Sequence, residues 1–181
     1  MAYLLRVLIL LMVLSIVFTG LIATGNISYD MSHIQIAIPS FMFTIFAQAF
    51  VMFYFIGVSR LVNNIDIILH QDGDMDELFD DKPSDLSPYL SKIKKFVYDA
   101  NLCKRQTIPW TMLMLVLGMM AFLLGGAHDT GLVSKSVHSG VVYGFAASML
   151  IGFARQWYYL GKSHLLLRKV KTLFSLPDSQ M

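Results

Sequence analysis

The fold of this chain is decided by an apolar stretch near its start, residues 3–24, which reads YLLRVLILLMVLSIVFTGLIAT. Arg6 is the one charge in this stretch. An α-helix needs about 20 predominantly apolar residues to cross a hydrocarbon core of about 30 Å. The stretch is long for the apolar region of a signal peptide and lacks a clear A-x-A cleavage site, so we interpret it as a retained membrane span.

Three more apolar stretches follow, at about residues 34–62, 108–127 and 137–160. Each is long enough to span a bilayer, and each should be a helix because lipid offers the backbone no hydrogen-bond partner. Hydrophobic residues make up 56% of the chain and charged residues only 14%, against about 25% charged residues in soluble domains. We predict an all-α integral membrane protein with four transmembrane helices. This composition excludes an ordinary soluble enzyme and a nucleic-acid-binding domain.

The basic residues are distributed asymmetrically about these spans. Every Lys and Arg except Lys135 falls at the N-terminus, in the link between the second and third spans, or near the C-terminus. Because basic residues concentrate on the cytoplasmic side of membrane proteins, we predict cytoplasmic N- and C-termini, with the loops around residues 25–33 and 128–136 outside. We expect the membrane to be a bacterial inner membrane.

The chain divides into a first helical hairpin (1–63), a link (64–106), a second hairpin (107–165) and a basic C-terminal tail (166–181). The link opens with an acidic loop, which reads either as a solvated loop or as a docking patch for a basic partner. Ser87 and Pro88 then provide an N-cap and a first-turn proline. The apolar stripe that follows predicts an amphipathic cytoplasmic helix on the membrane surface or on a partner subunit. The stripe consists of Leu90, Ile93 and Val97.

The two hairpins carry a short internal repeat. Residues 53–61 read FYFIGVSRL and residues 157–165 read WYYLGKSHL, with Tyr, Gly, Ser and Leu identical without gaps. The repeat indicates that the second and fourth spans run in the same direction. A parallel repeat of this kind implies an approximate two-fold axis along the membrane normal.

Histidines at the outer ends of the spans form the candidate binding site. His33 and His138 begin the second and fourth spans, and facing imidazoles in a bundle are what haem b ligation requires. Alternatively, His33, His128 and His138 with Asp129 offer the nitrogen and oxygen ligands that suit zinc or copper. A third interpretation is that these histidines simply hydrogen-bond to loops and water at the interface.

The sequence holds no P-loop, dinucleotide-binding turn, H-E-x-x-H or nucleophile-elbow motif, so we do not expect an enzyme. The leading hypothesis is a small non-catalytic subunit of a larger membrane complex, of a respiratory or electron-transfer kind. Its expected partners are the lipid bilayer and other membrane subunits, without nucleic acid. One alternative is a haem b-binding electron carrier with His33 and His138 as axial ligands. Another is a small transporter or channel, which the absence of buried charges and of clearly broken helices disfavours, Pro39 being the one obvious helix breaker.

Overall fold

The structure is a computed structural model that describes residues 1–28, 30, 33–70, 78–79 and 85–174, without the side chain of His33. The described residues form four α-helices and no strand, which confirms the predicted all-α fold. Most of the predicted acidic loop and the end of the basic tail lie outside the described residues. The helices are α1 (Ala2–Ala23), α2 (His33–His70), α3 (Ser87–Asp129) and α4 (Lys135–Phe174).

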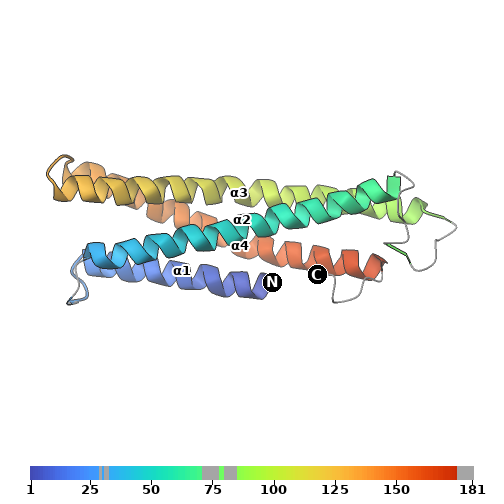
Figure 1. Ribbon diagram of the computed structural model, residues 1–181, viewed down its shortest axis with the longest axis horizontal. Helices are drawn as coiled ribbons and strands as arrows, with labels where there is room; N and C mark the ends of the chain where they lie inside the picture. Colours follow the sequence, from blue (N-terminus) through green and yellow to red (C-terminus); the bar gives the residue numbers. More distant parts are fainter. Residues whose placement is uncertain (29, 31–32, 71–77, 80–84, 175–181) are drawn as a thin grey trace.

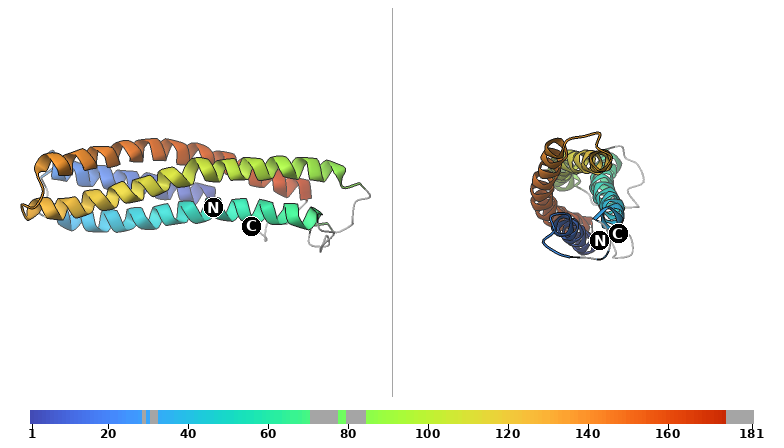
Figure 2. Two further views of the ribbon diagram at one scale, coloured as in Figure 1. Left: turned by 90° about the horizontal axis from the view of Figure 1, so that it is seen from above. Right: turned by 90° about the vertical axis from the view of Figure 1, so that its left-hand side faces the viewer.

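Consecutive helices run in opposite directions (Figure 1), and Figure 2 shows them end-on as a ring in which α4 closes against α1. The α1–α2 and α3–α4 connections lie at one end of the bundle, which we call the loop end. In each, a glycine in the left-handed region follows the threonine that caps the helix: Gly25 (φ 73°) after α1 and Gly131 (φ 75°) after α3. Such a glycine ends a helix without the steric cost that a side chain would add.

All four helices are long and apolar enough to cross a membrane. α1 has 22 residues, about 33 Å of helix, which matches one hydrocarbon core. α2, α3 and α4 have 38, 43 and 40 residues, about 57–65 Å of helix and roughly twice that thickness. They continue past the start of α1 (Figure 1), and we call residues 58–70, 87–102 and 161–174 the three-helix extension.

The bundle has two hydrophobic cores, one in its four-helix part and one in the extension. In the four-helix part, buried side chains come from all four helices: Leu5, Ile9, Met12, Ala47, Val51, Phe55, Cys103 and Leu160. In the extension they come from α2, α3, α4 and the α2–α3 link: Val58, Val62, Ile65, Leu69, Leu78, Ile93, Ala100, Leu166, Val170 and Phe174. The extension therefore has a core of its own, built from three helices.

The predicted amphipathic helix is not a separate element. Residues 87–129 form one continuous helix, α3, with Pro109 in its interior. The apolar stripe is covered by α2 and α4, which also extend: Ile93 is fully buried, and Leu90 and Val97 pack against the same core. Spans that end at residues 62 and 160 leave this stripe no helical partner within the chain, which is why the sequence indicates the membrane surface or a partner subunit instead.

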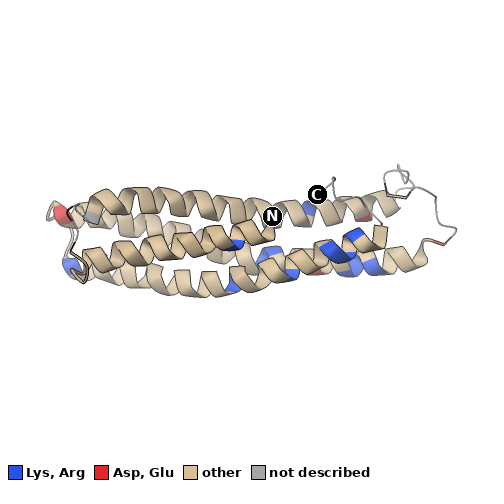
Figure 3. Cartoon of the chain, turned by 90° about the horizontal axis from the view of Figure 1, so that it is seen from below, with Lys and Arg blue, Asp and Glu red and all other residues tan. Residues whose placement is uncertain are grey.

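Charge is segregated along the bundle. Figure 3 shows that the described Lys and Arg residues gather on the extension and the adjoining part of the four-helix bundle. Lys135 stands apart, at the loop end. The long apolar part of the bundle between these two regions holds no described Lys or Arg, as a segment that lies in hydrocarbon requires.

The two members of the internal repeat have different surroundings. α2 and α4 do run in the same direction (Figure 1), as the repeat implies. However, a Cβ on Gly161 would lie 2.6 Å from Nη2 of Arg6, whereas a Cβ on Gly57 would meet no atom within 4 Å. Gly161 makes room for a side chain of α1, and Gly57 lies on an open surface. The repeat therefore does not extend to equivalent packing at these two glycines.

Candidate functional site

The loop end brings two of the predicted site residues together. The imidazole rings of His128 on α3 and His138 on α4 stack with centroids 5.9 Å apart and planes 12° from parallel. Nδ1 of His128 lies 3.1 Å from the carbonyl oxygen of Val133. Since a carbonyl only accepts hydrogen bonds, Nδ1 carries the proton. Nε2 of neutral His128 is then left with a lone pair, as a metal ligand requires.

His138 has an unsatisfied polar atom. Its Nδ1 is buried and has no hydrogen-bond partner, and buried polar atoms without a partner are uncommon in folded proteins. The ring lies so close to α3 that a Cβ on Gly125 would be 3.3 Å from its Cε1. A glycine at position 125 therefore lets the imidazole approach the backbone of the neighbouring helix.

The complete predicted ligand set is not assembled among the described residues. Asp129 is exposed, and no group of three His, Cys, Asp or Glu side chains in the described part of the chain is placed to hold a metal ion. The side chain of His33 lies outside the described residues. The haem pair of His33 and His138, and the larger metal set, therefore stay predictions.

Sequence reasoning missed a buried polar layer in the middle of the four-helix part. Gln48 on α2, Thr111 on α3 and Gln156 on α4 are fully buried, and Met12 on α1 is 1% exposed. Nε2 of Gln156 donates to Oε1 of Gln48 at 2.6 Å and to Oγ1 of Thr111 at 2.9 Å. Nε2 of Gln48 donates to Sδ of Met12 at 2.9 Å. We call these four residues the central layer.

The central layer ties all four helices together at one level. Polar side chains inside an apolar bundle favour the alignment in which their partners meet, because any other alignment leaves them unsatisfied. The signal in the sequence was the presence of Gln48 and Gln156 inside long apolar runs. Which face of the helix each glutamine occupies was the missing information.

A second polar contact joins α1 to α2 nearer the loop end. The hydroxyl of Ser40 lies 2.8 Å from that of Ser15 and 2.9 Å from that of Thr19. Small hydroxyl residues let neighbouring helices approach closely and hydrogen-bond across their contact. This contact fixes α1, the shortest helix, against α2.

Arginines at the other end of the four-helix part are held by neighbouring helices. Arg155 on α4 donates to the side chain and the backbone carbonyl of Gln106 on α3 and lies over the ring of Trp110 at 5.6 Å. Arg6 lies 5.1 Å from the ring of Trp157. α3 thus supplies the polar and aromatic partners of Arg155. The contacts of Arg155 with Trp110 and of Arg6 with Trp157 are cation–π pairs between helices.

No protein family, no curated protein and no solved structure matches this chain. The class of the protein therefore follows from its fold and composition: an all-α bundle of four helices that are long and apolar enough to span a membrane.

Proposed function

We propose that the protein is a small, non-catalytic subunit of a larger membrane complex, of a respiratory or electron-transfer kind. Its setting would be a bacterial inner membrane, with the three-helix extension and both termini in the cytoplasm. The asymmetry of the basic residues supports this orientation.

One observation carries the proposal: an exposed stripe on α3 in and beside the extension. Lys94, Lys95, Tyr98 and Arg105 are exposed, and their spacing of three, four and seven residues places them on one side of the helix. Tyr98 keeps 67% of its surface. Tyrosine and arginine are the residue types on which protein–protein binding energy concentrates. We call these four residues the α3 stripe and propose that it binds an acidic surface of a partner subunit.

The rest of the extension supports a scaffold role. Its buried side chains pack into a hydrophobic core, so Lys94, Lys95 and Tyr98 of the α3 stripe stand on rigid helices outside the four-helix part. A rigid surface loses little conformational entropy on binding and favours a stable complex. The side chains of the central layer are fully buried along the axis of the four-helix part. Because a channel needs an open path along this axis, the central layer favours a non-catalytic subunit over a channel.

The test is co-purification from native membranes in mild detergent, with native mass spectrometry to give the stoichiometry. The variant Lys94→Gln/Lys95→Gln/Tyr98→Ala removes two charges and one ring from the α3 stripe. We expect a fixed hetero-complex for the parent chain and its loss in this variant. The matched control on α4 is Lys162→Gln/Lys169→Gln/Tyr158→Ala, in which all three side chains are also exposed.

A chain that runs alone or only with copies of itself, at all detergent concentrations, would contradict the proposal. Loss of the complex in both triple variants would contradict the assignment of the α3 stripe, because the two variants change the same residue types.

A second candidate function is favoured by the stacked histidines at the loop end. The free Nε2 of His128 and the unpartnered Nδ1 of His138 offer two nitrogen ligands, and imidazole suits zinc, copper and haem iron. Elemental analysis and a visible spectrum of the purified protein test this function. We expect bound metal to be lost in His138→Ala and retained in His70→Ala. A preparation without metal and without absorption near the Soret region would eliminate it.

A further inference from the structure

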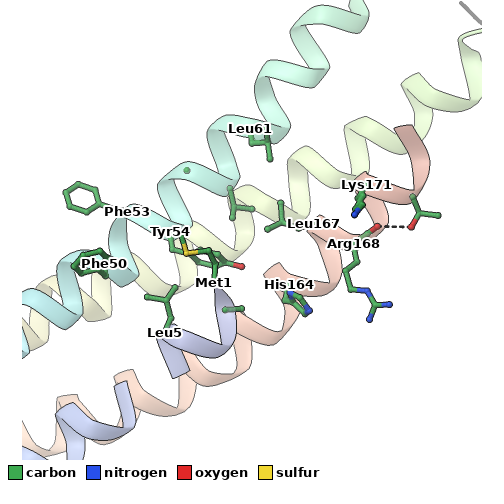
Figure 4. A pocket seen from close by; sticks show the side chains of 14 residues that line it. Met1, Leu5, Phe50, Phe53, Tyr54, Leu61, His164, Leu167, Arg168 and Lys171 are labelled. Atoms are coloured by element: carbon green, nitrogen blue, oxygen red, sulfur yellow. Dashed lines mark hydrogen bonds between the residues drawn. The ribbon is translucent and has the colours of Figure 1, made fainter. Parts of the chain in front are cut away.

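A groove of about 990 Å³ opens on the surface where α1 begins and α2 and α4 continue past it. Figure 4 shows its walls: Phe50, Phe53 and Leu61 come from α2, and Met1 and Leu5 come from α1. The groove exists because α1 is shorter than the helices beside it. Past the start of α1, no helix among the described residues covers the sides of α2 and α4 that line the groove.

One wall of the groove is apolar and aromatic. The exposed fraction of the surface is 46% for Phe50, 68% for Phe53 and 37% for Leu61. Gly57 lies between them on α2, and a Cβ there would meet no atom within 4 Å. The aromatic face of α2 is therefore open along the groove rather than packed against another helix of this chain.

The other wall is cationic. His164, Arg168 and Lys171 line the groove from α4, at a spacing of four and three residues that places them on one side of the helix. Figure 4 shows them along the rim of the groove, on the far side from Phe53. Among the described residues that line the groove there is no Asp or Glu. The first turn of α1, which has no side-chain cap, borders the groove as well and adds the positive end of a helix dipole.

The two walls fall at different depths of a bilayer. α1 has 22 residues and matches one hydrocarbon core, so its first residues mark a border between hydrocarbon and headgroups. From that border the aromatic residues Phe50 and Phe53 lie toward the hydrocarbon, and Arg168 and Lys171 lie toward the water, since α2 and α4 both run from the loop end outward.

We propose that this groove binds one anionic phospholipid of the surrounding bilayer. Its phosphate lies against Arg168 and Lys171, and one acyl chain lies along Phe50 and Phe53. The argument is charge complementarity at the correct depth: an amphiphile with a negative head and an apolar tail meets a cationic rim and an apolar wall in that order. The proposal rests on the membrane location of the helices and not on the accessory-subunit function.

The test is native mass spectrometry of the full chain in detergent, with phosphatidylglycerol and phosphatidylcholine of identical acyl chains as probes. We expect the parent chain to retain one phosphatidylglycerol in preference to phosphatidylcholine. The variant Arg168→Gln/Lys171→Gln should lose this preference by roughly fivefold for each cation removed, as for cations at an anionic membrane surface. The control Lys169→Gln/Lys94→Gln removes the same charge from exposed positions that do not line the groove, and should keep the preference.

A second pair of variants tests the apolar wall. Gly57→Leu places a side chain in the groove and should reduce retention of both lipids, while the fold persists because position 57 is open and leucine favours helix. The control Gly144→Leu is equally open but lies away from the groove on α4, and should leave retention unchanged. Equal retention of the two lipids by the parent chain would overturn the proposal. So would a photocrosslinker at Leu61 that captures a protein segment in native membranes and no lipid.

Discussion

Gln156 on α4 donates a hydrogen bond of 2.6 Å to Gln48 on α2, although the two residues are 108 positions apart in the chain. Both side chains are fully buried. The contact joins α2 to α4, two helices that are not consecutive in the chain, through the middle of the bundle. The central layer is thus the point at which the alignment of all four helices is specified by hydrogen bonds rather than by apolar packing alone.

Loss of one member of this pair should destabilise the bundle more than loss of both. Gln156→Leu leaves the amide of Gln48 without its closest partner, and we expect a cost of about 1–2 kcal/mol in the free energy of unfolding. Gln48→Leu/Gln156→Leu removes both amides and should recover part of this loss. Unfolding in mixed detergent micelles measures the free energy of unfolding of Gln48→Leu, of Gln156→Leu and of the double variant.

The control is Thr111→Val. The hydroxyl of Thr111 also donates to the carbonyl of Thr107 at 3.2 Å, so it has a second partner within α3 and depends less on Gln156. We expect a smaller effect there than in Gln156→Leu. Strictly additive effects of the two glutamine substitutions would show that the hydrogen bond does not couple α2 to α4.

The sequence predicted those features that depend on composition and charge, and failed on features that depend on contact. The apolar runs were sufficient to predict four helices, because a helix that crosses lipid needs only length and hydrophobicity. The extension was missed because Val62, Ile65 and Val170 become a core only when three helices meet. The sequence grouped His128 with His138 at the outer ends of the spans, but the stacking of their rings depends on the close approach of α3 to α4 at Gly125, which no local pattern reveals.

A methyl group at Gly152 should destabilise the contact between α3 and α4. A Cβ there would lie 2.5 Å from Sδ and 2.7 Å from Cε of Met114, whose side chain is 1% exposed. Gly152→Ala should therefore cost about 1–3 kcal/mol, the usual range for overpacking a core. Detergent-induced unfolding checks this value.

Gly144→Ala is the control on the same helix, because a Cβ at position 144 meets no atom within 4 Å. This variant should be neutral, or more stable by up to about 1 kcal/mol through helix propensity. Equal destabilisation by both alanines would mean that Met114 readily moves aside and that the close contact carries no cost.

The core of the extension should respond to truncation as a water-soluble core does. Ile93→Ala removes a fully buried side chain, so we expect a loss of about 2–4 kcal/mol. Ile67→Ala is the matched control, since Ile67 keeps 49% of its surface and should change stability by less than about 0.5 kcal/mol. Limited proteolysis of the extension and thermal unfolding are the measurements. An unchanged stability in Ile93→Ala would show that the extension does not fold cooperatively.

The start of α3 should be sensitive to acid through Asp85. The backbone N–H of Ser87 donates to Oδ1 of Asp85 at 2.9 Å, and this hydrogen bond holds the pKa of Asp85 below its ordinary value. A lowered pKa in the folded state means that the stabilisation is complete above the ordinary carboxyl pKa and is lost as the pH falls through the lowered value.

The NMR shifts of the Asp85 carboxyl group therefore measure its pKa. Amide exchange at Ser87 measures the opening of the first turn of α3. Exchange at Ser87 should rise only at acidic pH in the parent chain. It should be independent of pH in Asp85→Asn, once the intrinsic pH dependence of exchange is removed. A pKa of Asp85 at or above its ordinary value would contradict the hydrogen bond from the backbone N–H of Ser87 to Asp85.

The orientation of the bundle should be visible by single-cysteine labelling in the background Cys103→Ser. Cys103 is 2% exposed, so its removal leaves the introduced cysteines as the reactive sites. A cysteine at Ser28 or Leu132, at the loop end, should react with an impermeant maleimide added outside intact cells, since the outward side of a span carries few basic residues. A cysteine at Lys94 or Lys169 on the extension should react only after the membrane is opened. Labelling of both ends from outside would show that the helices do not cross the bilayer, and labelling of the extension alone would reverse the proposed orientation.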